Sequence, residues 1–82
     1  MVNIIDNGLR DAIAEARAAG RFERAIGLFE VRMAFKKDLW FKAIRGSEAS
    51  RVGMRTSFAL ATFQREGGVV PKAVFDAMEK LR

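Results

Sequence analysis

Residues 22–45 read FERAIGLFEVRMAFKKDLWFKAIR and form the longest uninterrupted helical pattern in the chain. Apolar residues occupy two sides of a helical wheel drawn for this segment. One side carries Phe22, Ala25, Ile26, Phe29, Met33, Trp40, Ala43 and Ile44, and the other carries Leu28, Val31, Phe35 and Leu39. A helix that is apolar on two sides usually packs against two neighbours. We therefore expect a long central helix here, or half of a dimer interface.

Sparse Gly and Pro residues divide the rest of the chain into segments rich in helix-forming residues. No segment alternates between apolar and polar residues for long enough to indicate a strand. The sequence therefore predicts an all-α fold, a compact bundle of about four helices in a single domain that covers residues 1–82. The expected helices span residues 4–19, 22–45, 47–65 and 71–81.

Several helix ends carry residues that favour those positions. Asn3 and Ser47 are candidate N-caps, because their side chains accept hydrogen bonds from free backbone N–H groups. Gly20 and the Gly67-Gly68 pair are expected to end helices, and Pro71 suits a first helical turn. The first helix has one apolar stripe, formed by Ile5, Leu9, Ala12, Ile13 and Ala16, and the third has another, formed by Ala49, Val52, Thr56, Ala59, Leu60 and Phe63.

Gly53 allows two interpretations of residues 47–65. The spacing of Ala49 and Gly53 is that of a helix-turn-helix unit, in which residues 57–65 would be the recognition helix. However, Glu48 stands where that unit needs a core residue. We therefore favour an unbroken helix that tolerates one glycine.

The net charge of +5 is concentrated in the middle of the chain. Residues 31–65 carry eight Lys and Arg against two acids, a local charge of +6. Residues 1–30 carry −1, and residues 66–82 are neutral. A local positive potential of this kind attracts anionic partners.

An unbroken third helix would carry a basic outward stripe. Arginine pairs its planar guanidinium with phosphate oxygens, and hydroxyl and aromatic side chains can meet base edges. The alternative is an ordinary solvated helix face or a protein contact. The predicted nucleic-acid contacts are Arg51, Arg55, Phe58, Thr62 and Arg65, together with Lys42 and Arg45.

Lysines and aromatic residues are interleaved in residues 35–45. This pattern fits a stacking platform for single-stranded nucleic acid on Trp40 or Phe41, or a basic amphipathic helix on a membrane surface or in a partner groove. Trp40 continues the stripe of Phe29, which favours a position in the core. Phe41 lies away from both stripes and near Lys37, so we expect Phe41 to be exposed, and Phe41 and Lys37 are the predicted protein contacts.

Composition argues against catalysis and metal binding. The chain has no Cys, no His and no Tyr, which removes thiolate and imidazole chemistry. Its Asp and Glu residues are scattered, and most of them lie three or four positions from a Lys or Arg, as Asp6 does from Arg10. This spacing is typical of surface pairs on helices. We expect no enzyme, no metal and no cofactor.

The sequence favours a small, basic, dimeric helical protein that binds DNA and acts in transcription regulation. The alternative is a non-catalytic protein-binding module: an adaptor, inhibitor or assembly subunit that covers a site on a larger partner. A homo-oligomeric structural component is the third possibility. We expect a cytoplasmic location, because no secretory signal or long apolar run is visible and cysteine is absent.

Overall fold

The computed structural model describes residues 1–43 and 51–82 in full, and the backbone of residues 44 and 45. Within these ranges the chain forms four helices and no strand, so the predicted all-α bundle with a long second helix is confirmed. The helices are α1 (Val2–Ala18), α2 (Phe22–Arg45), α3 (Met54–Arg65) and α4 (Lys72–Lys80).

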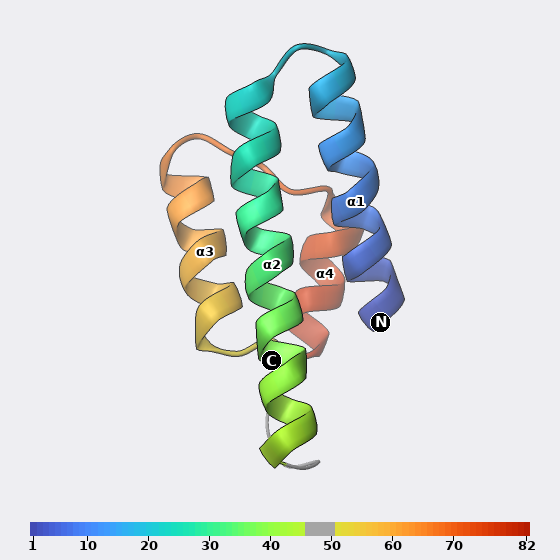
Figure 1. Cartoon of the computed structure of the whole chain (residues 1–82), viewed down its shortest axis with the longest axis vertical. Coiled ribbons are helices and arrows are strands. Elements are labelled where there is room, and N and C mark those ends of the chain that lie inside the picture. The colour runs from blue at the N-terminus through green and yellow to red at the C-terminus, as the bar shows by residue number, and fades with distance from the viewer. Residues whose placement is uncertain (46–50) are drawn as a thin grey trace.

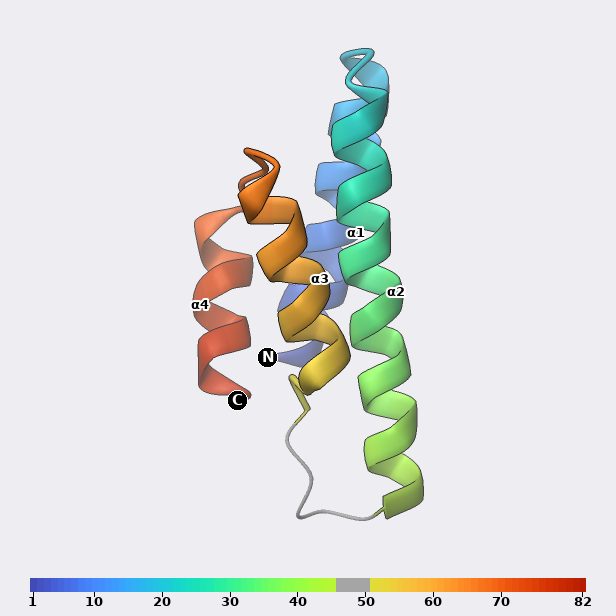
Figure 2. The same ribbon diagram turned by 90° about the vertical axis from the view of Figure 1, so that its left-hand side faces the viewer.

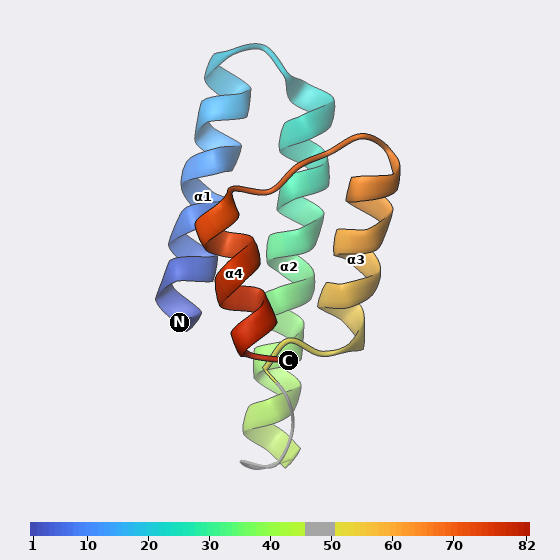
Figure 3. The ribbon, with the colours of Figure 1, turned by 180° about the vertical axis from the view of Figure 1, so that it is seen from behind.

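Helix α2 packs against both α1 and α3, and α4 packs against α1 (Figure 1). Seen from behind, α4 lies between α1 and α3 on the side of the bundle opposite α2 (Figure 3). Seen from the side, α2 forms an edge of the molecule (Figure 2). The C-terminal part of α2 extends beyond the ends of the other helices. The prediction that α2 has two neighbouring helices is therefore confirmed.

The core is built from one face of each helix. The apolar stripe predicted on α1 is confirmed, since four of its residues are buried and Ile13 packs against them. Burial of each large apolar side chain contributes about 1.5–3 kcal/mol, and this term holds the bundle together. The largest fully buried apolar side chains are Phe35, Ile5, Leu9, Leu28, Met78, Val31 and Val74.

One of the two apolar sides of α2 forms the core, joined by Ala25 from the other side. Leu28, Val31 and Phe35 are fully buried, whereas Trp40 on the other side is 60% exposed. The expectation that Trp40 lies in the core is therefore wrong. The physical reason is that α1 and α3 both pack toward the same half of α2, which leaves the opposite half at the edge of the molecule.

Three of the predicted helix starts differ from the structure, the last by one residue, because Pro71 is the N-cap of α4 and not its first residue. Met1 is the N-cap of α1, so Asn3 lies inside the helix. Residues 51–53 are not helical and α3 begins at Met54; the candidate cap Ser47 lies outside the described residues. Both glycine ends are confirmed, because Gly20 and Gly67 have φ of 74° and 88°, the left-handed region that glycine enters without a Cβ clash.

Candidate functional site

A carboxylate from α2 sets the start of α3. Asp38 is only 6% exposed, and its Oδ2 accepts hydrogen bonds from the backbone N–H groups of Gly53 and Thr56, each at 2.9 Å. The Thr56 hydroxyl donates a third bond at 2.6 Å. Asp38 therefore acts as the N-cap side chain for a neighbouring helix, where a negative charge also suits the positive end of the helix dipole.

Asp38 approaches Gly53 so closely that glycine is favoured at this position. A Cβ at position 53 would lie 3.0 Å from the Asp38 carboxyl carbon, closer than ordinary van der Waals contact. The prediction of an unbroken third helix is therefore wrong. The N–H groups of Gly53 and Thr56 donate to Asp38, so they do not form the hydrogen bonds that would extend the helix toward earlier residues. The first helix of the helix-turn-helix alternative falls largely on residues 46–50, which lie outside the described residues.

The break at Gly53 divides the predicted basic stripe. Arg51 is exposed but precedes α3, so it does not share the helix face of the others. Arg55 lies on α3, with its Nη1 3.7 Å from Asp38 Oδ1. At the far end of α3, Arg65 is exposed and its Nη2 donates to Thr62 Oγ1 at 3.3 Å. Phe58, 74% exposed, lies between them. The cations are therefore spread over both ends of α3.

The two remaining predicted nucleic-acid contacts lie on α2. Lys42 is half-buried, and the side chain of Arg45 lies outside the described residues. The structure thus brings Arg55, Phe58, Thr62 and Arg65 together on one helix, and it does not add Arg51 to that face.

Phe41 is half-buried rather than exposed. The Arg55 guanidinium lies 4.1 Å from the centre of its ring, and the Trp40 ring meets it edge to face at 5.0 Å. Arg55 reaches this position because α3 starts so close to Asp38. Lys37 is exposed, as expected for a protein contact, and the exposed aromatic residue of this segment is Trp40.

The outward side of α2 carries an aligned row of large apolar side chains, which we call the α2 outer face. Its members are 38–64% exposed although they are among the most apolar residues of the chain. Two shallow grooves lie beside different parts of the row. Ile13 and Arg17 of α1 line the groove beside Phe22, Ile26 and Phe29, and Arg55 of α3 lines the groove beside Phe29 and Met33. The α2 outer face consists of Phe22, Ile26, Phe29, Met33 and Trp40.

The sequence analysis placed all five residues on one side of the helix but did not predict that this side is exposed. Their positions 22, 26, 29, 33 and 40 are separated by four, three, four and seven residues, a seven-residue repeat in which Lys36 takes the place of one apolar residue. That spacing is typical of a seam between two long helices, and it was the available signal.

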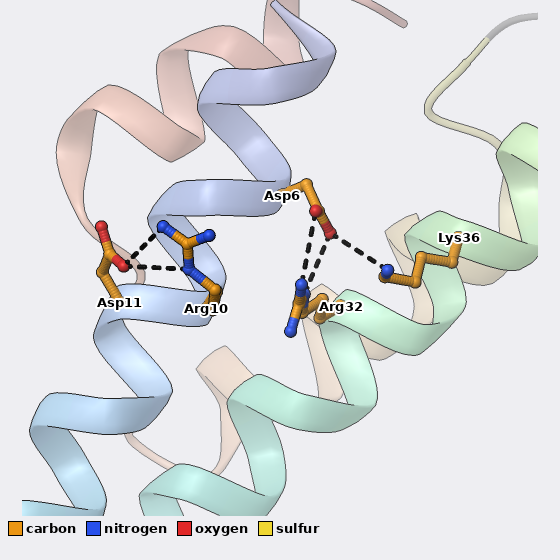
Figure 4. Close-up of polar contacts among 5 residues, drawn as sticks. All are labelled: Asp6, Arg10, Asp11, Arg32 and Lys36. Carbon is orange, nitrogen blue, oxygen red and sulfur yellow. Dashed lines mark hydrogen bonds and ion pairs between the residues drawn. The ribbon is translucent and has the colours of Figure 1, made fainter.

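An ion-pair cluster between α1 and α2 neutralises part of the central positive charge (Figure 4). Arg32 Nε donates to Asp6 Oδ1 at 2.9 Å, and Lys36 Nζ lies 3.7 Å from the same oxygen. The hydrogen bond from Arg32 lowers the pKa of Asp6, and the same bond raises the pKa of Arg32. The pair expected between Asp6 and Arg10 does not form, since Arg10 pairs with Asp11 at 3.1 Å.

The described residues show no three Asp or Glu side chains grouped so that they could hold a metal ion. Across residues 1–45 and 51–82, no helix has the length and apolar content needed to cross a bilayer. Comparison of the chain with protein-family models, with curated proteins and with solved structures finds no match.

Proposed function

We propose that this protein is a non-catalytic protein-interaction module and that the α2 outer face is its contact surface. The observation that carries the proposal is a row of five large apolar side chains that are exposed to solvent along one helix. Contiguous apolar surface of this kind marks interaction sites on small proteins. Aromatic and Met side chains are also enriched in the buried centres of interfaces.

The shape of the surface favours a helical partner. The row follows one helix, with a groove toward α1 beside its first half and a groove that reaches Arg55 of α3 beside its middle. A ridge between two grooves is the form that a second helix packs against, with apolar anchors at helical spacing. The proposal is therefore a module that docks along α2, in keeping with an adaptor, inhibitor or assembly subunit.

The test compares two exposed phenylalanines on different helices. Phe29 lies at the centre of the α2 outer face and is 51% exposed, whereas Phe58 on α3 is 74% exposed. The protein is isolated after mild cross-linking, with nuclease present, and the mass of the complex is measured. We expect Phe29→Glu to abolish the stoichiometric complex and Phe58→Glu to preserve it. Equal complexes for both variants and the parent chain would overturn the proposal.

A DNA- or RNA-binding function is a second candidate, favoured by one observation. The exposed Trp40 ring lies on the same segment as exposed Lys37, and Arg51 is exposed just before α3. Cations and an accessible aromatic ring are the elements of single-strand binding. This candidate depends on the C-terminal part of α2 and the start of α3, since the stripe predicted along the third helix is divided.

Salt dependence tests this second candidate. Titration with a single-stranded and a duplex oligonucleotide would be followed by the fluorescence of Trp40, the one tryptophan of the chain. Binding through phosphates should weaken by about 0.7–0.9 log units per log unit of salt for each phosphate contacted. Arg51→Ala should weaken binding and Phe58→Ala should not. A folded protein that binds neither oligonucleotide at low salt would exclude this function.

A further inference from the structure

We propose that the α2 outer face is covered by α2 of a second copy of this chain, packed antiparallel so that Glu23 of each copy faces Lys37 of the other. This inference rests on the proposed function, because it names the partner of the same surface. The arguments are the spacing of the apolar row, the position of α2 in the molecule, and the order of charges beside the row.

The apolar row has the period of a two-helix seam. Two helices stay in contact over several turns only when their apolar residues repeat every 3.5 residues. The row from Phe22 to Trp40 keeps this repeat and is about 27 Å long at 1.5 Å per residue. Position 36 completes the repeat, and Lys36 there directs its ammonium to Asp6 on α1. A long side chain of this kind can lay its apolar stem along the seam.

The position of α2 allows a second helix to reach this seam. Helix α2 forms an edge of the molecule, and the core lies on its other side. A surface that meets its own copy through a two-fold axis must be complementary to itself. The α2 outer face can meet this condition, because reversing the row places Phe22 opposite Trp40 and Phe29 opposite Met33, while Ile26 meets the apolar stem of Lys36.

The charges beside the row favour the antiparallel orientation. Glu23, Glu30 and Lys37 stand seven residues apart and form one flanking row on the α3 side of the seam. All three are exposed, and no ion pair found in residues 1–43 and 51–82 involves them. In an antiparallel pair, this flanking row lies beside the same row of the second copy, which runs in the opposite direction. Glu23 then faces Lys37 of the other copy, and symmetry repeats the contact.

The parallel orientation has the opposite electrostatic result. It would bring the flanking row against the row on the other side of the seam, which contains Arg32. Lys37 would then face Arg32 of the other copy, a like-charge contact that is unfavourable. The charge pattern therefore distinguishes the two orientations of the same apolar seam.

The antiparallel register also fixes the apolar contacts. With Glu23 opposite Lys37, Phe22 packs near Trp40 of the second copy and Phe29 near Met33. Glu30 then approaches Glu30 of the second copy close to the two-fold axis. The repulsion between these two carboxylates weakens the dimer. Replacement Glu30→Gln should therefore tighten the dimer.

Charge reversal tests the orientation. Dimerisation is measured by sedimentation equilibrium and by the shift of Trp40 emission to shorter wavelength as the ring is covered. We expect Glu23→Lys and Lys37→Glu each to raise the dimer Kd about tenfold, because each change replaces two attractive contacts by two repulsive ones. A one-to-one mixture of the two variants, and the double variant E23K/K37E, should both regain the parent Kd.

Controls carry the same charge changes away from the seam. Glu15→Lys on α1 and Lys80→Glu on α4 replace exposed residues and should leave the Kd unchanged. A dimer that Lys37→Glu tightens would overturn the antiparallel orientation. A parent chain that stays monomeric at every concentration would overturn self-association. If Phe29→Glu then still removes a different bound protein, the proposed function stands; if it removes nothing, the proposed function fails as well.

Discussion

Asp38 shows how one buried side chain connects two helices. It accepts three hydrogen bonds from the start of α3, and these bonds join residues 15 and 18 positions apart in the chain. We expect Asp38→Ala to lower the free energy of unfolding by about 3 kcal/mol, because the N–H groups of Gly53 and Thr56 lose their partner. Urea unfolding followed by circular dichroism measures the change. The exposed Asp11→Ala should change it by less than about 0.5 kcal/mol, and a similar small change for Asp38→Ala would contradict this role.

Asp6 gives the protein an acid-sensitive contact. Its hydrogen bond from Arg32 lowers its pKa below the ordinary value of 3.8, so folding favours the ionised form. The resulting stability is present at neutral pH and is lost as the pH falls below about 4, through the pKa of the folded state. We expect Asp6→Asn to lower the unfolding free energy by about 1 kcal/mol at pH 7. The difference between parent and variant should shrink as the pH falls below about 4 and through the lowered pKa of Asp6; a difference that stays constant at low pH would show that the charge is not its source.

Glycines inside two helices allow their neighbours to approach closely. A Cβ at Gly27 of α2 would overlap the ring of Phe63 on α3, and one at Gly8 of α1 would overlap Val74 on α4. Alanine favours a helix over glycine by about 1 kcal/mol. We nevertheless expect Gly27→Ala to destabilise the protein by about 1–3 kcal/mol, because the Phe63 ring must move.

A second substitution separates packing from helix propensity in this case. The variant Phe63→Val removes the Cδ1 and Cε1 ring atoms that meet position 27. In that background, Gly27→Ala should cost much less in urea unfolding than it does in the parent chain. An equal cost in both backgrounds would show that the overlap with Phe63 is not the cause.

The elements that the sequence predicts well are those whose limits depend on nearby residues. The limits of α2, the single stripe of α1 and the glycine ends after α1 and α3 all follow from local spacing and from left-handed glycines. The start of α3 does not, because the side chain that caps it comes from α2. The exposure of one side of α2 could not be predicted from the sequence either. Both of its sides are apolar, and only the placement of α1 and α3 decides which one is buried.

At the scale of the whole molecule, apolar contact and charge contact respond differently to salt. The chain measures 40 × 22 × 19 Å, with α2 along its length. Self-association through the α2 outer face depends mainly on apolar burial, which added salt does not weaken. We expect the dimer mass to persist as salt rises from about 0.05 to 0.5 M, while any nucleic-acid binding falls by orders of magnitude. Loss of the dimer over this range would indicate that charge, rather than apolar contact, holds it.

The unfolding temperature of the whole molecule should also depend on protein concentration. Association stabilises the folded chain by mass action, so a tenfold rise in concentration should raise Tm by about 4 °C in a domain of this size. Phe29→Glu should remove this dependence. Because Phe29 is half exposed in the single chain, parent and variant should share one Tm at the lowest concentration. A variant with a lower Tm at every concentration would mean that Phe29 supports the fold itself, and a parent Tm that is constant over a hundredfold dilution would mean that no second copy covers α2.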